Sequence, residues 1–168
     1  MAEKEQIPQF SEYSPAFKAY EIRQLGRSDV HLLKDLLKVF SEAFDDFSTY
    51  QSAVPADTYL ESMLGKSHVI ALIALYRDNV VGGLTAYQLD KFEQDRREIY
   101  IYDLGVLEAH RLKGIARSLI QELKRIAKDR AAYVIFVQAD SGDTAPIRLY
   151  ESLGKREDVH NFDIPVDS

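Results

Sequence analysis

The sequence predicts an α/β protein whose central sheet contains strands of mixed direction. Three observations lead to this fold class. Apolar residues alternate with the period of a strand in some segments and recur with the period of a helix in others. These segments follow one another in the order β, α, α, β, β, β, α, β, α, β, as in a sheet flanked by helices. The composition, with 46% hydrophobic and 29% charged residues among 168, is that of one globular domain.

The first half of the chain is predicted to form a strand, two helices and a hairpin after an N-terminal extension. Residues 1–16 are polar, carry two prolines and show no period, so we expect a loosely ordered extension before a single domain at 17–168. Ser28 and Asp57 are the expected helix caps. The predicted elements are a strand at 17–25, helices at 30–44 and 57–64, and paired strands at 68–76 and 80–89.

The second half is predicted to alternate strands and helices. The strand at 133–139 is apolar on both faces, which is typical of a central strand. Pro146 suits the first turn of a helix, and Gly154 suits its end. The predicted elements are strands at 98–106, 133–139 and 159–164, and helices at 114–130 and 146–153.

Charge and composition limit the classes of function. The net charge of −6 argues against nucleic acid as the main partner and is compatible with a cationic substrate, although an acidic surface can simply maintain solubility. The chain has no cysteine, no apolar run long enough to span a membrane and no secretory signal, so we expect a cytoplasmic protein without membrane attachment. The four histidines show no metal-ligand spacing, and we expect no metal.

The loop after the strand at 98–106 has the features of an anion site. A buried strand ends at Val106, and a helix begins near Gly114 and the small Ala116. The start of a helix exposes unpaired N–H groups and positive potential, to which Arg111 and Lys113 add charge. These features predict a pyrophosphate site, with an ordinary βα turn as the alternative.

Two motifs resemble those of the GNAT acetyltransferases. Arg111-x-x-Gly114-x-Ala116 looks like the acyl-CoA motif of that family, and residues 145–154 resemble its downstream Ala-x-x-x-Leu-Tyr-x-x-x-Gly helix. The resemblance implies the GNAT fold, with a mixed sheet of about six to seven strands, flanking helices and a splayed cleft for acetyl-CoA.

A closer resemblance extends over roughly residues 30 to 165. Segments 91–94, 98–104, 137–140 and 162–164 look like those of the aminoglycoside 3-N-acetyltransferases, the gentamicin-acetylating type. Gly105 departs from this pattern, where Ala is expected. The resemblance implies acetylation of the 3-amino group of an aminoglycoside, hence antibiotic resistance, and a possible homodimer. The lack of cysteine favours direct transfer in a ternary complex.

The resemblance also implies which residues contact acetyl-CoA. Backbone groups of Leu104 and Val106 would bind the pantetheine amides, and the loop 111–116 would bind the pyrophosphate. The expected cofactor-binding residues are Leu104, Gly105, Val106, Arg111, Leu112, Lys113, Gly114, Ile115, Ala116 and Tyr150.

Asp103 is the candidate general base, because it is a carboxylate within an otherwise apolar strand. The alternative is an aspartate that bonds backbone at a bulge. Glu98 is the reserve base. Tyr150 is the candidate general acid by resemblance, and packing between helix and sheet is the alternative.

A polycationic substrate requires several acceptors. The expected substrate-binding residues are Asp103, Asp140, Asp163, Glu93 and Tyr102. Solvated loop acids remain the alternative for most of these carboxylates. Two other functions also remain open, namely acetylation of a polyamine or peptide amine, and a CoA-binding module without enzymatic activity.

Overall fold

The computed structural model describes residues 20–166. These residues fall into two compact units, and the boundary lies between Val137 and Gln138. The predicted extension at 1–16 lies outside the described residues, as do positions 17–19 of the first predicted strand.

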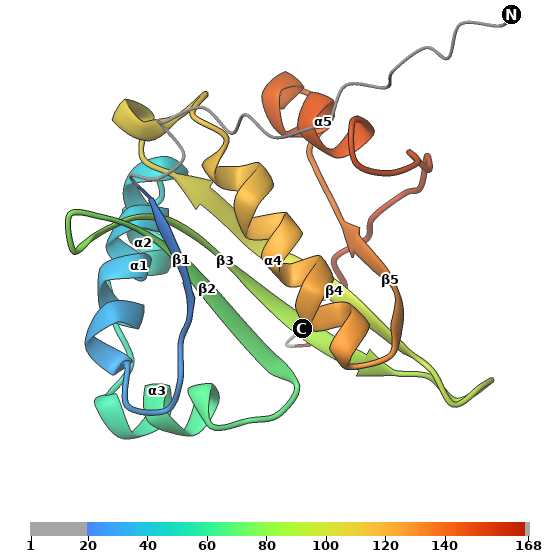
Figure 1. The fold of residues 1–168 in the computed structure, drawn as a ribbon, viewed down its shortest axis with the longest axis horizontal. Coiled ribbons are helices and arrows are strands. Elements are labelled where there is room, and N and C mark those ends of the chain that lie inside the picture. Colours follow the sequence, from blue (N-terminus) through green and yellow to red (C-terminus); the bar gives the residue numbers. More distant parts are fainter. Residues whose placement is uncertain (1–19, 167–168) are drawn as a thin grey trace, which may run out of the picture. The chain divides into compact units, whose positions relative to one another are not determined.

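The first unit contains a five-stranded mixed sheet in the order β1-β2-β3-β4-β5 (Figure 1). The first three pairings are antiparallel, and β4 pairs with β5 in parallel. The predicted mixed α/β sheet is therefore confirmed, with five strands in the described residues instead of six to seven. The strands are β1 (Glu21–Gln24), β2 (Val69–Tyr76), β3 (Asn79–Asp90), β4 (Arg97–Val106) and β5 (Ala132–Val137).

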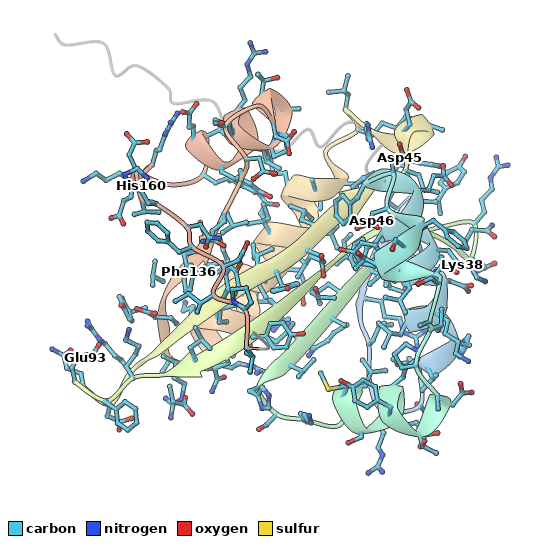
Figure 2. All side chains as sticks on the ribbon, turned by 180° about the vertical axis from the view of Figure 1, so that it is seen from behind. Lys38, Asp45, Asp46, Glu93, Phe136 and His160 are labelled. Atoms are coloured by element: carbon cyan, nitrogen blue, oxygen red, sulfur yellow. The ribbon has the colours of Figure 1, made fainter. Side chains whose placement is uncertain are left out.

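Helices cover both faces of this sheet, as the opposite views in Figures 1 and 2 show. The long helix α4 packs on one face, and α1 packs on the other face against β3 and β4. Successive side chains of a strand point to opposite faces of the sheet, so the core is divided between the two helices. Ala71 and Ile73, for example, belong to the cluster beneath α1. The helical elements of this unit are α1 (Val30–Ala43), α2 (Phe47–Tyr50), α3 (Asp57–Leu64), the 3-10 turn η2 (Glu108–His110) and α4 (Ile115–Asp129).

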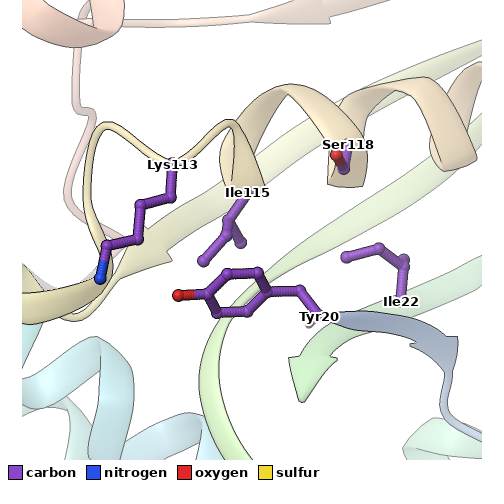
Figure 3. Close-up of a pocket in the computed structure, with 5 residues that line it drawn as sticks. All are labelled: Tyr20, Ile22, Lys113, Ile115 and Ser118. Carbon is purple, nitrogen blue, oxygen red and sulfur yellow. The ribbon is translucent and has the colours of Figure 1, made fainter. Parts of the chain in front are cut away.

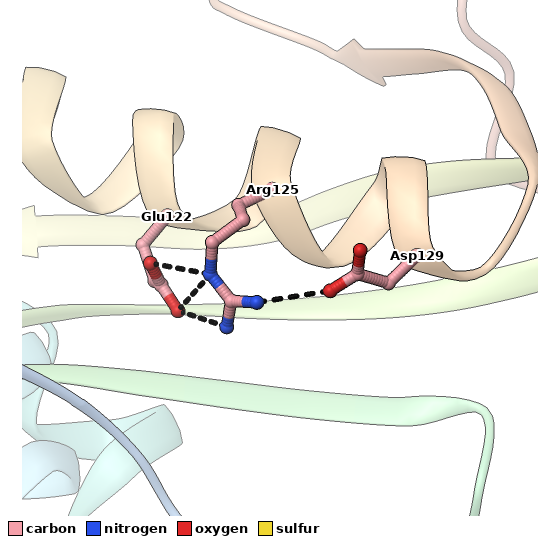
Figure 4. Close-up of polar contacts among 3 residues, drawn as sticks. All are labelled: Glu122, Arg125 and Asp129. Carbon is pink, nitrogen blue, oxygen red and sulfur yellow. Dashed lines mark hydrogen bonds and ion pairs between the residues drawn. The ribbon is translucent and has the colours of Figure 1, made fainter.

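The amphipathic pattern of α4 explains its position. Ile115, Leu119 and Leu123 are buried toward the sheet, at the spacing of one helix face. On the solvent side, the Arg125 guanidinium lies 2.7 Å from a Glu122 carboxylate oxygen and 2.9 Å from one of Asp129 (Figure 4). Such exposed pairs stabilise a helix by only about 0.2–0.5 kcal/mol each, so burial of the apolar face dominates.

Two strand glycines allow α1 to approach the sheet closely. A methyl group on Gly105 would lie 3.0 Å from Phe40 Cδ1, which explains why this position has no side chain. A methyl group on Gly83 would overlap the Leu72 carbonyl oxygen and lie 2.5 Å from Leu36 Cδ1. Gly83 pairs with Gly105 across β3 and β4, so the two glycines form one contact surface for α1.

The variant Gly83→Ala is expected to lower the free energy of unfolding by about 1–3 kcal/mol, because the Leu72 carbonyl is backbone and cannot move aside. Thermal unfolding followed by circular dichroism measures this loss. Gly142→Ala is the control, since its methyl group would meet no atom within 4 Å. Equal melting temperatures for the two variants would contradict the proposed close contact.

The second unit contains α5 (Thr144–Glu151) and an extended C-terminal segment. The predicted strand at 159–164 is wrong, since no strand forms there. A segment becomes a strand only when another backbone pairs with it, and its own apolar alternation does not determine that.

The prediction that the strand at 133–139 is central is also wrong for the described residues. β5 is the last strand of the sheet, and Tyr133 is 51% exposed. Its apolar sequence reflects packing against α4 on one face and a set of aromatic rings on the other.

Candidate active site

The second half of β4 has no strand partner on the side of β5. Pairing between β4 and β5 ends at Ile101 and Val137, while β4 continues to Val106. The Leu107 N–H donates to Val81 on β3, and backbone groups alternate in direction along a strand. The N–H and C=O groups of Leu104 and Val106 therefore point away from β3, on the side of β4 that has no strand partner. This geometry suits them to bind an amide-containing chain.

The loop that follows β4 forms a concave arrangement of backbone N–H groups. Leu112 and Gly114 both have left-handed backbone angles, with φ of 59° and 80°. The first helical bond of α4 runs from Ser118 N to Gly114 O, so the N–H groups of Ile115 and Ala116 precede the hydrogen-bond ladder. No side chain caps this end of the helix. The geometry of such a turn at a helix start suits an anion such as pyrophosphate.

The cationic side chains of the loop also stabilise its shape. Arg111 Nε donates to the Val106 carbonyl at 3.0 Å, and its terminal nitrogen donates to the Ala43 carbonyl at 3.2 Å. Lys113 Nζ donates to the Ala109 carbonyl at 2.8 Å. Arg111 therefore links the loop to the ends of β4 and α1. Its positive charge lies near the N–H groups of the loop and of the start of α4, which we call the cradle. The sequence motif indicated the positive charge of Arg111 but not its hydrogen bonds to the Val106 and Ala43 carbonyls.

Three of the expected cofactor-binding residues, Gly105, Leu112 and Ile115, differ in which of their groups a ligand could contact. Gly105 faces Phe40 and pairs with β3, so it acts in packing. The Leu112 side chain is fully exposed. The Ile115 side chain is buried, and only its backbone is available to a ligand.

A small cavity of about 20 Å³ lies under the start of α4 (Figure 3). It is lined by Tyr20, Ile22, Lys113, Ile115 and Ser118. The Tyr20 hydroxyl is hydrogen-bonded to His110 Nδ1 at 3.1 Å, which joins the loop to the chain before β1. The cavity has room for about one water molecule, and we assign it no role in holding a cofactor.

The Asp103 carboxylate lies on the α1 face of the sheet and accepts two hydroxyl hydrogen bonds. The Tyr50 hydroxyl donates to Oδ1 at 2.6 Å, and the Thr85 hydroxyl donates to Oδ2 at 2.7 Å. Asp103 follows a β-bulge, because Thr85 pairs with Asp103 while Ala86 pairs with Ile101. Bulges often redirect side chains beside active sites. The carboxylate thus bonds side chains at the bulge, unlike the backbone-bonded alternative.

Tyr50 is held by aromatic contacts at the end of α1. Its ring centre lies 5.7 Å from those of Phe40 and Phe44. Burial, followed by the hydrogen bond to Asp103, raises the pKa of Tyr50 well above its usual value. The phenol therefore remains a donor. Its partnership with Asp103 could not be read from the sequence, because 53 residues separate them.

A set of aromatic rings, which we call the tyrosine face, adjoins Asp103. Tyr100 lies 4.9 Å from Phe136 and 5.9 Å from Tyr102, and Tyr87 lies 5.9 Å from Tyr102, all between ring centres. Burial and then the Asp103 charge raise the pKa of Tyr87. Tyr102 is 64% exposed. The tyrosine face therefore offers an accessible aromatic surface beside a carboxylate.

Glu98 and Glu93 belong to an ionic cluster at the other end of β4. Glu98 accepts from the Tyr133 hydroxyl, and this bond, with that from Lys91, lowers its pKa. Glu93 accepts from Arg96 at 2.9 Å, which lowers its pKa too. Glu98 is five positions from Asp103, roughly 17 Å along a strand. Figure 2 shows Glu93 at the opposite end of the unit from Asp45 and Asp46. The structure does not bring either glutamate to Asp103.

The remaining predicted site residues lie in the second unit. Asp140 and Asp163 are exposed, and Tyr150 is on α5. Burial and then the Asp143 carboxylate raise the pKa of Tyr150, so its phenol keeps its proton at neutral pH. The roles of these three residues stay predictions.

Two features are absent from residues 20–166. No group of three or more His, Cys, Asp or Glu side chains is arranged to hold a metal ion. None of the described helices is both long enough and apolar enough to cross a bilayer.

A mixed sheet in which β4 continues unpaired beyond the end of β5, followed by an uncapped helix start, defines an α/β protein with features suited to an anionic ligand. The chain belongs to the acetyltransferase (GNAT) family, which matches residues 33–155. The acetyl donor of that family is acetyl-CoA.

Proteins of known structure or function are similar to this chain to different extents. A crystal structure of an aminoglycoside acetyltransferase from an uncultured soil metagenomic sample is 49% identical, with a TM-score of 0.87 over 88% of this chain and 99% of that chain. A second soil aminoglycoside acetyltransferase, in complex with sisomicin, is 24% identical and covers 89% and 98% of the two chains. Its TM-score of 0.80 shows the same fold.

N-acetyltransferase 8B of Homo sapiens is 24% identical over 90 residues, which are 54% of this chain. The match spans 40% of that human relative's own length.

Proposed function

We propose that this protein transfers the acetyl group of acetyl-CoA to the 3-amino group of the deoxystreptamine ring of aminoglycosides. The observation that carries the proposal is the position of Asp103, a carboxylate on β4 that lies beside the tyrosine face and three residues before the strand end. The 49% identity to a soil aminoglycoside acetyltransferase supports this substrate class. We expect the enzyme to act in the cytoplasm, as a possible homodimer, and to confer resistance.

The cofactor would lie along the unpaired side of β4. The backbone groups of Leu104 and Val106 would bind the pantetheine amides, and the loop from Arg111 to Ala116 would bind the pyrophosphate. From Asp103 to Val106 is three residues, or roughly 10 Å of strand. The proposed base is therefore separated from the loop that would bind the pyrophosphate. This suits acetyl-CoA, because its thioester lies some distance from its phosphates.

Transfer requires a neutral amine, whereas alkylamines are largely protonated near neutral pH. Asp103 would accept a proton from the ammonium group, and the neutral amine nitrogen would then form a bond to the acetyl carbon. The carbon–sulfur bond breaks, the Tyr150 hydroxyl would protonate the departing thiolate, and the second proton released from the nitrogen would restore the phenol. The products are an amide and free CoA.

Substrate recognition would combine charge with ring packing. Asp103 and the exposed Tyr102 ring adjoin each other and suit an ammonium group on a sugar ring. Asp140 and Asp163 are proposed as further acceptors. Glu93 is proposed as an acceptor only for a distant part of the substrate, because it is already paired with Arg96.

A thiol-release assay with acetyl-CoA tests the proposal. Gentamicin and sisomicin are expected to be acetylated, and NMR of the product should place the new amide at the 3-amino group. Spermidine and a lysine peptide are expected to react at least a hundredfold more slowly. Turnover of spermidine or peptide without any aminoglycoside would contradict the substrate class. An amide at another amino group would contradict the regiospecificity alone.

A further inference from the structure

The Asp103 carboxylate is held from two sides by elements that are distant in sequence. Tyr50 reaches Oδ1 from α2, and Thr85 reaches Oδ2 from β3. We infer that Tyr50 and Thr85 are positioning residues that fix the orientation of the Asp103 carboxylate toward the amine of the substrate. The inference rests on the proposed role of Asp103 as the base.

The hydrogen-bond capacity of a carboxylate makes this arrangement useful. An ionised carboxylate has about four acceptor positions, and each hydroxyl occupies one of them on a different oxygen. Rotation of the carboxylate would break both bonds, so the pair restricts the group to one orientation. Both donors are neutral, so the negative charge stays available to an ammonium ion. The acceptor positions of Asp103 that remain open to the substrate then keep a fixed direction.

The two donors are themselves anchored in different ways. Thr85 lies directly opposite Asp103 in the β3–β4 register, so strand pairing sets its distance. Tyr50 depends on the short helix α2, where Asp46 accepts from Thr49 N at 2.9 Å, and on the rings of Phe40 and Phe44. Tyr50 therefore couples the end of α1 to the candidate base.

A double-mutant cycle separates positioning from general support of the fold. Tyr50→Phe and Thr85→Val remove one hydroxyl each with little change in shape. Each is expected to lower kcat about tenfold, because small misplacements of a reacting group are costly, while KM for acetyl-CoA changes less than twofold. Thr85→Ser keeps the hydroxyl and is expected to recover most of the lost kcat.

The decisive comparison uses the Asp103→Asn background. If the hydroxyls act through the carboxylate, Tyr50→Phe and Thr85→Val cause no further loss of kcat there. Tyr133→Phe is the matched control, since it removes a phenol that donates to Glu98, another carboxylate on the same strand. We expect it to leave kcat within twofold of the unmodified protein.

The cycle is run with whichever amine is turned over fastest, so it does not depend on the identity of the substrate. Losses that multiply fully in the Asp103→Asn background would overturn the inference and leave the proposed function intact. So would an equal loss in Tyr133→Phe, or a Thr85→Ser variant as slow as Thr85→Val. Absence of turnover with every amine would remove the proposed function and this inference together.

Discussion

Asp103→Asn is expected to lower kcat by about 100- to 10,000-fold, the range associated with loss of a general base. Asparagine has nearly the same shape but cannot take up a proton, so the amine would remain largely protonated. The substitution also converts one acceptor oxygen into a donor that faces a hydroxyl, at Tyr50 or at Thr85. Steady-state kinetics across a range of aminoglycoside concentrations measures the loss.

Acetyl-CoA binding is expected to survive this substitution, because the cradle is built from the loop after β4 and not from Asp103. Calorimetric titration with CoA should give a Kd within about threefold of the unmodified protein. Glu98→Gln is the control, as it changes a carboxylate on the same strand that is already paired with Lys91. A near-normal kcat for Asp103→Asn, together with a large loss for Glu98→Gln, would transfer the role of base to Glu98.

Gly114→Val is expected to weaken acetyl-CoA binding by at least a hundredfold. The backbone at Gly114 has φ of 80°, a left-handed conformation that costs an ordinary residue about 1–2 kcal/mol and a β-branched residue more. This strain acts on the turn that presents the first N–H groups of α4, where the pyrophosphate is expected, and so reduces the affinity of that turn for an anion.

Leu112→Gly is the control for that experiment, because Leu112 is the other left-handed position of the loop and its side chain is fully exposed. Removing this side chain relieves backbone strain and leaves the N–H groups in place, so CoA affinity is expected to stay within threefold. Circular dichroism checks that both variants are folded. Unchanged CoA binding by a folded Gly114→Val protein would contradict the position of the cradle.

Local patterns in the sequence were sufficient for most elements of the first unit. The helices α1 and α4 and the strands β2, β3 and β4 begin and end within a few residues of their predicted bounds, because their apolar periods are long and clear. The short α2 was missed, since four residues with one turn of helix give no periodic signal. The strand predicted at 159–164 failed for the opposite reason, as its pattern was clear but no backbone pairs with it.

The candidate site was only partly visible in the sequence. The anion loop could be recognised because its glycine, its small residue and its cations lie within six positions, at a strand-to-helix boundary. Asp103 stood out as a carboxylate in an apolar strand. The hydrogen bonds from Tyr50 and Thr85 to Asp103 could not be predicted. The position of Thr85 within the apolar run of β3 was only a weak signal.

The sequence was sufficient to predict the main elements of the first unit, a loop with the features of an anion site and the family, because these depend on residues close together along the chain. The groups that surround Asp103, and the acids that are already paired at the far end of β4, became known only from the fold. It also showed that Arg111 tethers its loop and that Gly105 admits α1. These features depend on strand register and on the packing of α1, which join residues that are distant in the sequence.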